Sequence, residues 1–313
     1  GALGDGVHKD SPAIQRAIDA CAADSGAADS GGAVYCPPGT YLCGTITLKS
    51  HVNLHLEAGA TLLGSPEPAD YTPLYPDPSW INRFNFDQHL IRARGAQNVS
   101  ISGQGAIDGN GRAYFGPKLP GRHKLSVGDW RPGPMLTFIE CQDVSVRDVR
   151  LLDSPAFALW TVGCDRVHAS GLTILNQRDG PNCDGIQVVC CHGVRISDCY
   201  ISAGDDCIAV YGMSYFLAEP RPCENVVASN CVLSTPCNGV RVGYTGDWPI
   251  RNCAFSNLVM FDTRTGISMI CTPYNAWKTA REHESHHGPV TENISFDHIQ
   301  MEVRKPIDLW IDE

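Results

Sequence analysis

The sequence predicts an all-β fold, a parallel β-helix with a short capping helix at its N-terminus. A motif of alternating apolar and polar residues around one central apolar residue returns eight times along the 313 residues. Cysteines recur at equal offsets from that central residue in several copies. Such regular self-similarity is typical of solenoids, in which each repeat contacts its neighbours.

The repeat has strand periodicity, because apolar and polar residues alternate over a few positions in every copy. Successive copies are 47, 45, 23, 27, 32, 27 and 41 residues apart, so one coil needs 23 to 27 residues and longer intervals carry loops. The central residues are Val52, Val99, Val144, Val167, Val194, Val226, Cys253 and Ile294. One copy cannot bury its own apolar face, whereas stacked copies bury a continuous core. A β-sandwich would give no reason for residues to recur at matching offsets.

The cysteines follow the repeat in two series. One series stands three residues before the central valine, and the other stands five residues after it. The first series is Cys141, Cys164, Cys191 and Cys223, and the second is Cys199 and Cys231. Equal offsets lie above one another in a solenoid, so we expect ladders of buried thiols. Disulfides between neighbours are the alternative, although 15 cysteines leave at least one unpaired.

The N-terminal segment has a different pattern. Asp10-Ser11-Pro12 reads as a capped helix start, and Ile14 and Ile18 begin an apolar stripe with helical spacing. We expect residues 1–35 to form a cap region that covers the open end of the solenoid. No linker or shift in composition follows, so residues 1–313 are predicted to form a single parallel β-helix domain.

Charge and hydropathy exclude two classes of partner. The net charge is −10, with 24 basic and 34 acidic residues, which argues against nucleic acid as the main partner. Apolar runs are far shorter than the ~18 residues of a membrane-spanning helix, so no membrane partner is expected. The chain is expected to be a monomer.

Three carboxylates stand out by their context. Asp184 lies in PNCDGIQV, and Asp205 and Asp206 lie in AGDDCIAV, 21 residues further on and about one coil away. Neighbouring carboxylates repel, so the pKa of at least one should rise. A protonated and an ionised carboxyl side by side suit acid/base cleavage of a glycosidic bond. The plainer interpretation is that both segments are ordinary Asx and glycine turns.

Several segments together resemble the polygalacturonase-like, pectin-cleaving glycoside hydrolase family 28 over nearly the whole chain. They include GDGVHKDSPAIQRAIDAC, GGAVYCPPGTYLCGTITLKS, GQGAIDGNG and, more specifically, NCDGIQV followed by GDDCIAV. The resemblance implies a right-handed, pectin-lyase-like parallel β-helix that hydrolyses a pectin-like polysaccharide with inversion. It implies no metal and no other cofactor, and a secreted or periplasmic protein, although no signal peptide is recognised in this chain.

The resemblance also implies roles for individual residues. Asp205 would be the general acid, while Asp184 and Asp206 would hold and deprotonate the attacking water. Asn182 would orient Asp184 or contact the sugar. Inversion needs room for the water, so the acid and base carboxyls should be roughly 6.5–9.5 Å apart, or closer where the family runs tight.

Two departures from the family pattern bear on the substrate. The family's Gly-His-Gly motif aligns with Cys237-Asn238-Gly239, so Asn238, which cannot titrate near neutral pH, takes the place of the histidine. The Arg-Ile-Lys motif aligns with residues 268–270, Ser-Met-Ile, which removes two cations that would grip a galacturonate carboxylate. The lost cations argue against ordinary polygalacturonase activity on galacturonan; rhamnogalacturonan and other pectic substrates stay open, as does a neutral or differently decorated glycan.

Other residues could replace the missing cations. Arg241 adjoins the altered Asn238 motif, although it could equally be an outward-facing strand residue. The stretch 273–288 is long for a turn and carries Trp277, Lys278 and Arg281. We expect Trp277 to provide a sugar platform and Lys278 or Arg281 to contact an anion, with a merely solvated loop as the alternative.

Two rival functions keep the same fold. The first is a catalytically impaired glycan-binding protein, in which Asn238 marks lost activity. The second is a polysaccharide lyase or epimerase, which would need a Ca²⁺ cluster or a Lys or Arg as proton abstractor.

Overall fold

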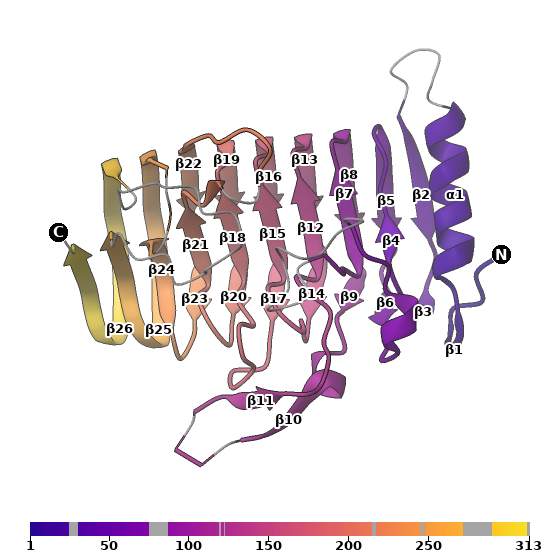
Figure 1. Cartoon of the computed structure of the whole chain (residues 1–313), viewed down its shortest axis with the longest axis horizontal. Helices are drawn as coiled ribbons and strands as arrows, with labels where there is room; N and C mark the ends of the chain where they lie inside the picture. Colours follow the sequence, from indigo (N-terminus) through magenta and orange to yellow (C-terminus); the bar gives the residue numbers. More distant parts are fainter. Residues whose placement is uncertain are drawn as a thin grey trace.

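The computed structural model describes residues 1–24, 31–74, 87–118, 120–121, 123–214, 217–244, 246, 248–271 and 290–311. The chain winds into a right-handed parallel β-helix, with the coils stacked from the N-terminal to the C-terminal end (Figure 1). Each coil contributes one strand to each of three parallel faces, which we name sheets A, B and C.

The strands of each sheet pair with the equivalent strands of the coils before and after them. Sheet A contains β4 (Ile46–Thr47), β7 (Ile91–Arg94), β12 (Leu136–Ile139), β15 (Leu159–Val162), β18 (Ile186–Val189), β21 (Ile208–Tyr211) and β24 (Asn238–Gly243). Sheet B contains β2 (Gly32–Cys36), β5 (Val52–Leu56), β8 (Gln97–Gly103), β13 (Gln142–Arg147), β16 (Asp165–Ser170), β19 (His192–Ser197) and β22 (Cys223–Ser229). Sheet C contains β1 (Asp5–Lys9), β3 (Gly39–Cys43), β6 (Ala60–Gly64), β9 (Ala106–Asp108), β14 (Arg150–Leu152), β17 (Thr173–Leu175), β20 (Tyr200–Ser202) and β23 (Val232–Ser234).

The last two coils and a hairpin complete the architecture. β25 (Ile250–Cys271) and β26 (Thr291–Ile311) are long strands that bend through successive faces. β10 (Phe115–Lys118) and β11 (Leu125–Val127) form an antiparallel hairpin that projects from the solenoid beside the turns between sheets C and A (Figure 1). Two short 3₁₀ helices, η2 (Pro68–Asp70) and η3 (Gly111–Tyr114), lie in loops.

The central residues of the repeat stack inside the solenoid. Val144 pairs with Val167, which pairs with Val194, which pairs with Val226, and all four are buried. The residue just before the central position has a positive φ in coil after coil, between 51° and 72° from Asn98 to Asn293. Asn, Asp and Gly adopt this left-handed conformation most readily, which explains why they recur at this position.

The predicted thiol ladders are confirmed. All 15 cysteines are free thiols. The backbone N–H of Cys164 lies 3.3 Å from the Sγ of Cys191 on the next coil, and Cys199 and Cys231 belong to the second stack. Burial raises the pKa of the Cys164 thiol, as expected for cysteines that serve as small apolar core residues.

The capping helix α1 (Ser11–Asp24) covers the first coils, with Ile14 and Ile18 buried against them. Asp10 plays a different part from the predicted helix cap. Its carboxylate accepts N–H bonds from Leu3 and Gly4 at 2.7 and 3.0 Å, and only its backbone carbonyl starts the helix. The first coil begins at β2, inside the predicted cap region of residues 1–35.

The left-handed backbone conformation before the central residue of the repeat can be tested at Asn252. Its φ is 55°, it donates to Asn225, and it accepts from Asn293 at 2.9 Å. We expect Asn252→Val to lower the free energy of unfolding by about 2 kcal/mol, since it adds left-handed strain and removes two side-chain bonds. Asn252→Gly, which tolerates the backbone conformation, should cost less. Urea denaturation measures both, and equal losses would contradict the strain argument.

Candidate active site

The three predicted carboxylates meet at the turns that lead from sheet C into sheet A. Asp184 precedes β18, and Asp205 and Asp206 precede β21 on the next coil. The N–H of Gly185 donates to the backbone oxygen of Asp206 at 2.8 Å, so the ladder between coils extends into these turns. The prediction that these residues occupy neighbouring rungs is confirmed.

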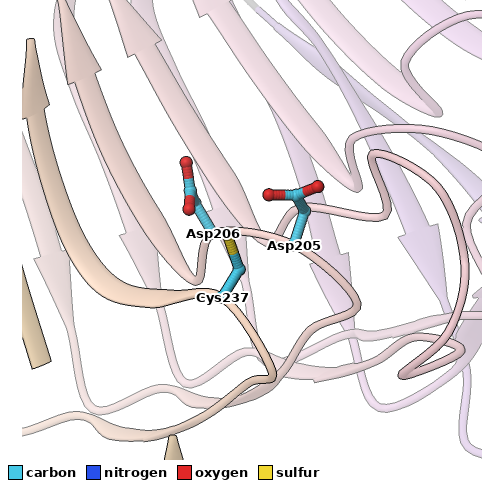
Figure 2. Close-up of side chains that lie close together, drawn as sticks. All are labelled: Asp205, Asp206 and Cys237. Carbon is cyan, nitrogen blue, oxygen red and sulfur yellow. The ribbon is translucent and has the colours of Figure 1, made fainter. Parts of the chain in front are cut away.

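Asp205 and Asp206 point to the same region as Cys237 of the following coil (Figure 2). A carboxylate oxygen of each and the sulfur of Cys237 lie within 4.8 Å of one another. The carboxylates of Asp205 and Asp206 therefore lie close together beside Cys237. Two side-chain cations pair with these carboxylates, so the positive charge that such a cluster needs is supplied by the chain itself.

Asp206 is held by three side chains. Arg241 Nε lies 2.8 Å from its Oδ2, the amide of Asn238 donates to its Oδ1 at 2.5 Å, and the Tyr211 hydroxyl lies 3.4 Å from Oδ2. The side chains of Asp206 and Arg241 are only 4% and 13% exposed. Burial would lower the pKa of Arg241, but the charge of Asp206 and the smaller contributions of its other acidic neighbours together outweigh burial and raise that pKa. Asp206 therefore belongs to a buried ion pair and also accepts a hydrogen bond from Asn238.

Asp205 is the most accessible of the three carboxylates, with 18% of its side chain exposed. The ammonium of Lys124, from the β10–β11 hairpin, contacts its Oδ2. The hairpin is anchored nearby on Asp179, whose backbone oxygen accepts from the Leu125 N–H at 2.8 Å and whose carboxylate pairs with Lys118 at 2.9 Å. Lys124 thus reaches the site from a segment far away in the sequence.

Among the described residues, no cation lies within ion-pair distance of Asp184. Asp184 is 3% exposed, its Oδ2 accepts from the Gln187 amide at 2.8 Å, and its buried Oδ1 has no hydrogen-bond partner among the described residues. Burial first, and then the charge of Asp206, raise the pKa of Asp184 to about 7. The expected rise of one pKa is confirmed, and it falls on the carboxyl that the resemblance assigns to water activation rather than to the general acid.

The backbone around Asp184 is fixed by two polar side chains. Arg131, which is buried, donates to the backbone oxygens of Pro155 and Pro181 and to the side chain of Asn182 at 3.1 Å. Asn176 donates to the backbone oxygen of Asp184 at 2.9 Å. These contacts set the loop before β18 and hence the direction of the Asp184 side chain.

This arrangement can be compared with known proteins. Residues 39–312 match the model of the family described as Glycosyl hydrolases family 28. The chain belongs to glycosyl hydrolase family 28. Residues 1–69 also match a model described as Rhamnogalacturonase A/epimerase, pectate lyase-like.

Individual relatives of this family 28 protein agree with that result. It is 28% identical over 282 residues to a probable polygalacturonase of Vitis vinifera, covering 85% of this chain and 55% of the relative. It is 26% identical over 241 residues to polygalacturonase QRT2 of Arabidopsis thaliana, covering 73% and 48%. The chain thus spans about half the length of these curated relatives. An exopolygalacturonase structure from Thermotoga maritima matches with a TM-score of 0.78 and 23% identity, covering 99% of this chain and 74% of that one.

The structure of this family 28 protein places the other predicted residues as follows. Asn238 and Arg241 both contact Asp206, so Arg241 is a buried ion-pair partner and not an exposed strand residue. Asn182, with a φ of 56°, is tied to Arg131. The remaining three candidates, Trp277, Lys278 and Arg281, lie outside the described residues.

Two cations, Arg241 and Lys124, pair with the carboxylates of the site in this family 28 protein, and the sequence motifs alone do not predict these pairings. Ser268 of β25 stands at a position where the family motif has a cation. Arg241 pairs in register with Ser268. The chain therefore has a cation at the equivalent strand position, one coil before the place where the family has it. Lys124 lies in a loop of the long 45-residue interval, and no motif marks it. The length of that interval is the only signal that could have directed attention to the hairpin.

Asp184 tests the electrostatics of the site in this family 28 protein. Because its folded-state pKa is raised to about 7, the folded chain holds a proton that the unfolded chain releases above about pH 4. Stability should therefore fall as the pH rises from 4 to 7. Asp184→Asn should remove this decline and raise the free energy of unfolding at pH 8 by on the order of 1–4 kcal/mol.

Urea denaturation across the pH range measures the Asp184→Asn effect. Asp198→Asn is the matched control, since Asp198 is a turn residue whose pKa is lowered by hydrogen bonds from Ser197 and Asn230. This control should keep the decline between pH 4 and 7. Parallel curves for Asp184→Asn and the parent would contradict the assignment.

Proposed function

We propose that this chain is a glycoside hydrolase that cleaves a galacturonan-type pectin or a related acidic glycan by acid/base catalysis with inversion. The observation that carries the proposal is the division of charge in the carboxylate trio. Asp206 lies in an ion pair, Asp205 contacts an ammonium, and the pKa of Asp184, raised to about 7, leaves this carboxyl about half protonated at pH 7. A carboxyl that retains a proton near neutral pH thus lies beside two carboxylates that are paired with cations, and acid/base cleavage requires such a combination of protonated and ionised groups.

Asp205 is the proposed general acid because it is the most accessible carboxyl. It would donate its proton to the leaving glycosidic oxygen as the bond to the anomeric carbon breaks. Asp206, with Asp184 beside it, would hold the water and accept its proton while the water oxygen bonds to that carbon. Both oxygens of Asp206 are already engaged by Asn238 and Arg241, so it is better suited to hold a water than to attack the sugar itself.

Lys124 links substrate charge to the acid role of Asp205. While its ammonium contacts Asp205, it favours the ionised carboxylate, which cannot donate a proton. A uronate carboxylate on the substrate would compete for the same ammonium. Substrate binding would then supply an anion contact and release Asp205 to take up a proton, which favours uronate-containing glycans over neutral ones.

A catalytically impaired glycan-binding protein is the second candidate, and Asn238 is the observation that favours it. Asn238 donates to Asp206 but has no titrating group, so it cannot relay a proton as the family histidine could. In this case the chain would bind the glycan without turnover.

Asp205→Asn separates the two candidates. For a hydrolase we expect turnover of polygalacturonate to fall by about 10³-fold while affinity changes little. NMR of the parent's early products should show the inverted anomer. Asp19→Asn, which removes an exposed carboxylate of α1 away from the site, is the control and should keep most activity. A parent that binds polygalacturonate and releases no product over long incubation would establish the binding protein instead.

Lys124→Met tests the role of the hairpin cation. We expect KM for a uronate substrate to rise about tenfold, because one charge-assisted contact is lost. The alkaline limb of the pH profile of kcat/KM, which reports the free enzyme, should move to higher pH, because the cation that favours ionised Asp205 is gone. Lys118→Met, which removes an ion pair at the base of the same hairpin, should leave that limb in place. An unchanged KM and pH profile for Lys124→Met would exclude the proposed contact.

A further inference from the structure

The outer face of sheet B carries a groove that the proposed chemistry does not use. Its volume is about 670 Å³, and it crosses β13, β16, β19 and β22. The proposed catalytic carboxylates lie at the turns before the strands of sheet A, so the groove belongs to a different face of the solenoid. The lining side chains include Asp143, Arg147, Arg166, His168, Arg195 and Val227.

Positive charge dominates this groove although the whole chain has a net charge of −10. Arg166 forms two contacts of 2.7 Å with Asp143 and is thereby neutralised. Neither Arg147 nor Arg195 has a carboxylate within ion-pair distance among the described residues, and both are exposed. Two full positive charges therefore stay available to a ligand.

The cations are spaced by the coil repeat. Arg147, Arg166 and Arg195 belong to three successive coils, and His168 pairs in register with Ser145 on one side and Arg195 on the other. Neighbouring strands are roughly 4.8 Å apart, which is similar to the length of one sugar unit in a polymer. Arg147 and Arg195 belong to β13 and β19, two coils apart, so along the solenoid axis they are separated by about two such units.

The two arginines lie close enough to His168 to change its pKa. Burial, together with the charges of Arg195 and Arg147, lowers the pKa of His168, while Asp198 on the turn after β19 opposes that change. Asp143 and Asp198 are the carboxylates that face these cations. His168 near neutrality is thus a neutral ring between two arginines, able to donate or accept a hydrogen bond from a hydroxyl.

We infer that this groove is a second binding site for a polyuronate chain, which lies along the solenoid axis with its carboxylates on Arg147 and Arg195. Charge complementarity selects an anionic polymer, and the two-coil separation of Arg147 and Arg195 matches carboxylates on units two apart in that polymer. The choice of a uronate over other anions rests on the proposed function. Such a site would hold the polymer on the protein while the carboxylate trio acts on another part of it.

The test measures binding of polygalacturonate to the full chain in the Asp205→Asn background, so that turnover plays no part. We expect Arg147→Ala/Arg195→Ala to weaken binding about tenfold at low salt, and the difference to shrink at high salt. In the active background the same double variant should hydrolyse short oligouronates normally and long polymer less efficiently. Arg147→Lys/Arg195→Lys, which keeps the charges, should retain most of the affinity.

Arg16→Ala is the matched control, because it removes an exposed arginine of α1, away from the groove. Circular dichroism and thermal melting check that each variant folds. If the alanine double variant does not fold, the salt dependence of binding by the folded lysine double variant still tests the role of the two charges. Equal affinity of the parent and the alanine double variant would overturn the site. Tighter arginine-dependent binding of a sulfated glycan than of polygalacturonate would overturn its assignment to uronates. A chain that shows this loss of binding but no hydrolysis would refute the proposed function and leave the groove standing.

Discussion

Hydrogen bonding in register between successive coils is the constraint on which the rest of the structure depends. It places each residue of one coil directly over its equivalent in the next, about one strand spacing away. Apolar residues at such positions form a continuous core, as in the column from Val144 to Val226. Ionisable residues at such positions are forced together at a distance where like charges repel strongly. The same rule therefore stabilises the interior and creates the unusual chemistry of the turns before sheet A.

The carboxylate trio shows how the chain compensates for this repulsion. Asp206 and Asp205 each receive a cation, Arg241 from the following coil and Lys124 from the hairpin. Asp184 has no cation within ion-pair distance among the described residues, and its pKa is raised, so it keeps its proton up to about pH 7. Two different solutions to one electrostatic problem thus give carboxyls of different protonation within one site, which is the arrangement that acid/base catalysis uses. The buried Oδ1 of Asp184 has no hydrogen-bond partner among the described residues, so the cost of burying this oxygen is not offset there.

The sequence predicted those features that repeat and missed those that depend on one long-range contact. The offsets of valines and cysteines predict the coil, its core and the thiol ladders, because each depends only on position within a repeat. The interval of 21 residues between Asp184 and Asp205 predicts their proximity for the same reason. Lys124 could not be placed in this way, since its hairpin interrupts the repeat and its contact with Asp205 spans 81 residues. Asp10 was expected to cap a helix, but the N-terminal loop lies close enough to take its carboxylate instead.

Sheets A and B use arginine in opposite ways, and the difference follows from what covers them. The outward face of sheet A beside the trio is buried, so the charge of Arg241 must be matched inside the protein, and Asp206 matches it. The outward face of sheet B meets solvent, where water can solvate Arg147 and Arg195 without a partner. A buried, matched cation fixes the geometry of a reacting group, whereas an exposed, unmatched one remains available to a ligand. One coil repeat can therefore position catalytic groups on one face and hold a charged polymer on another, because burial decides which use each charge is put to.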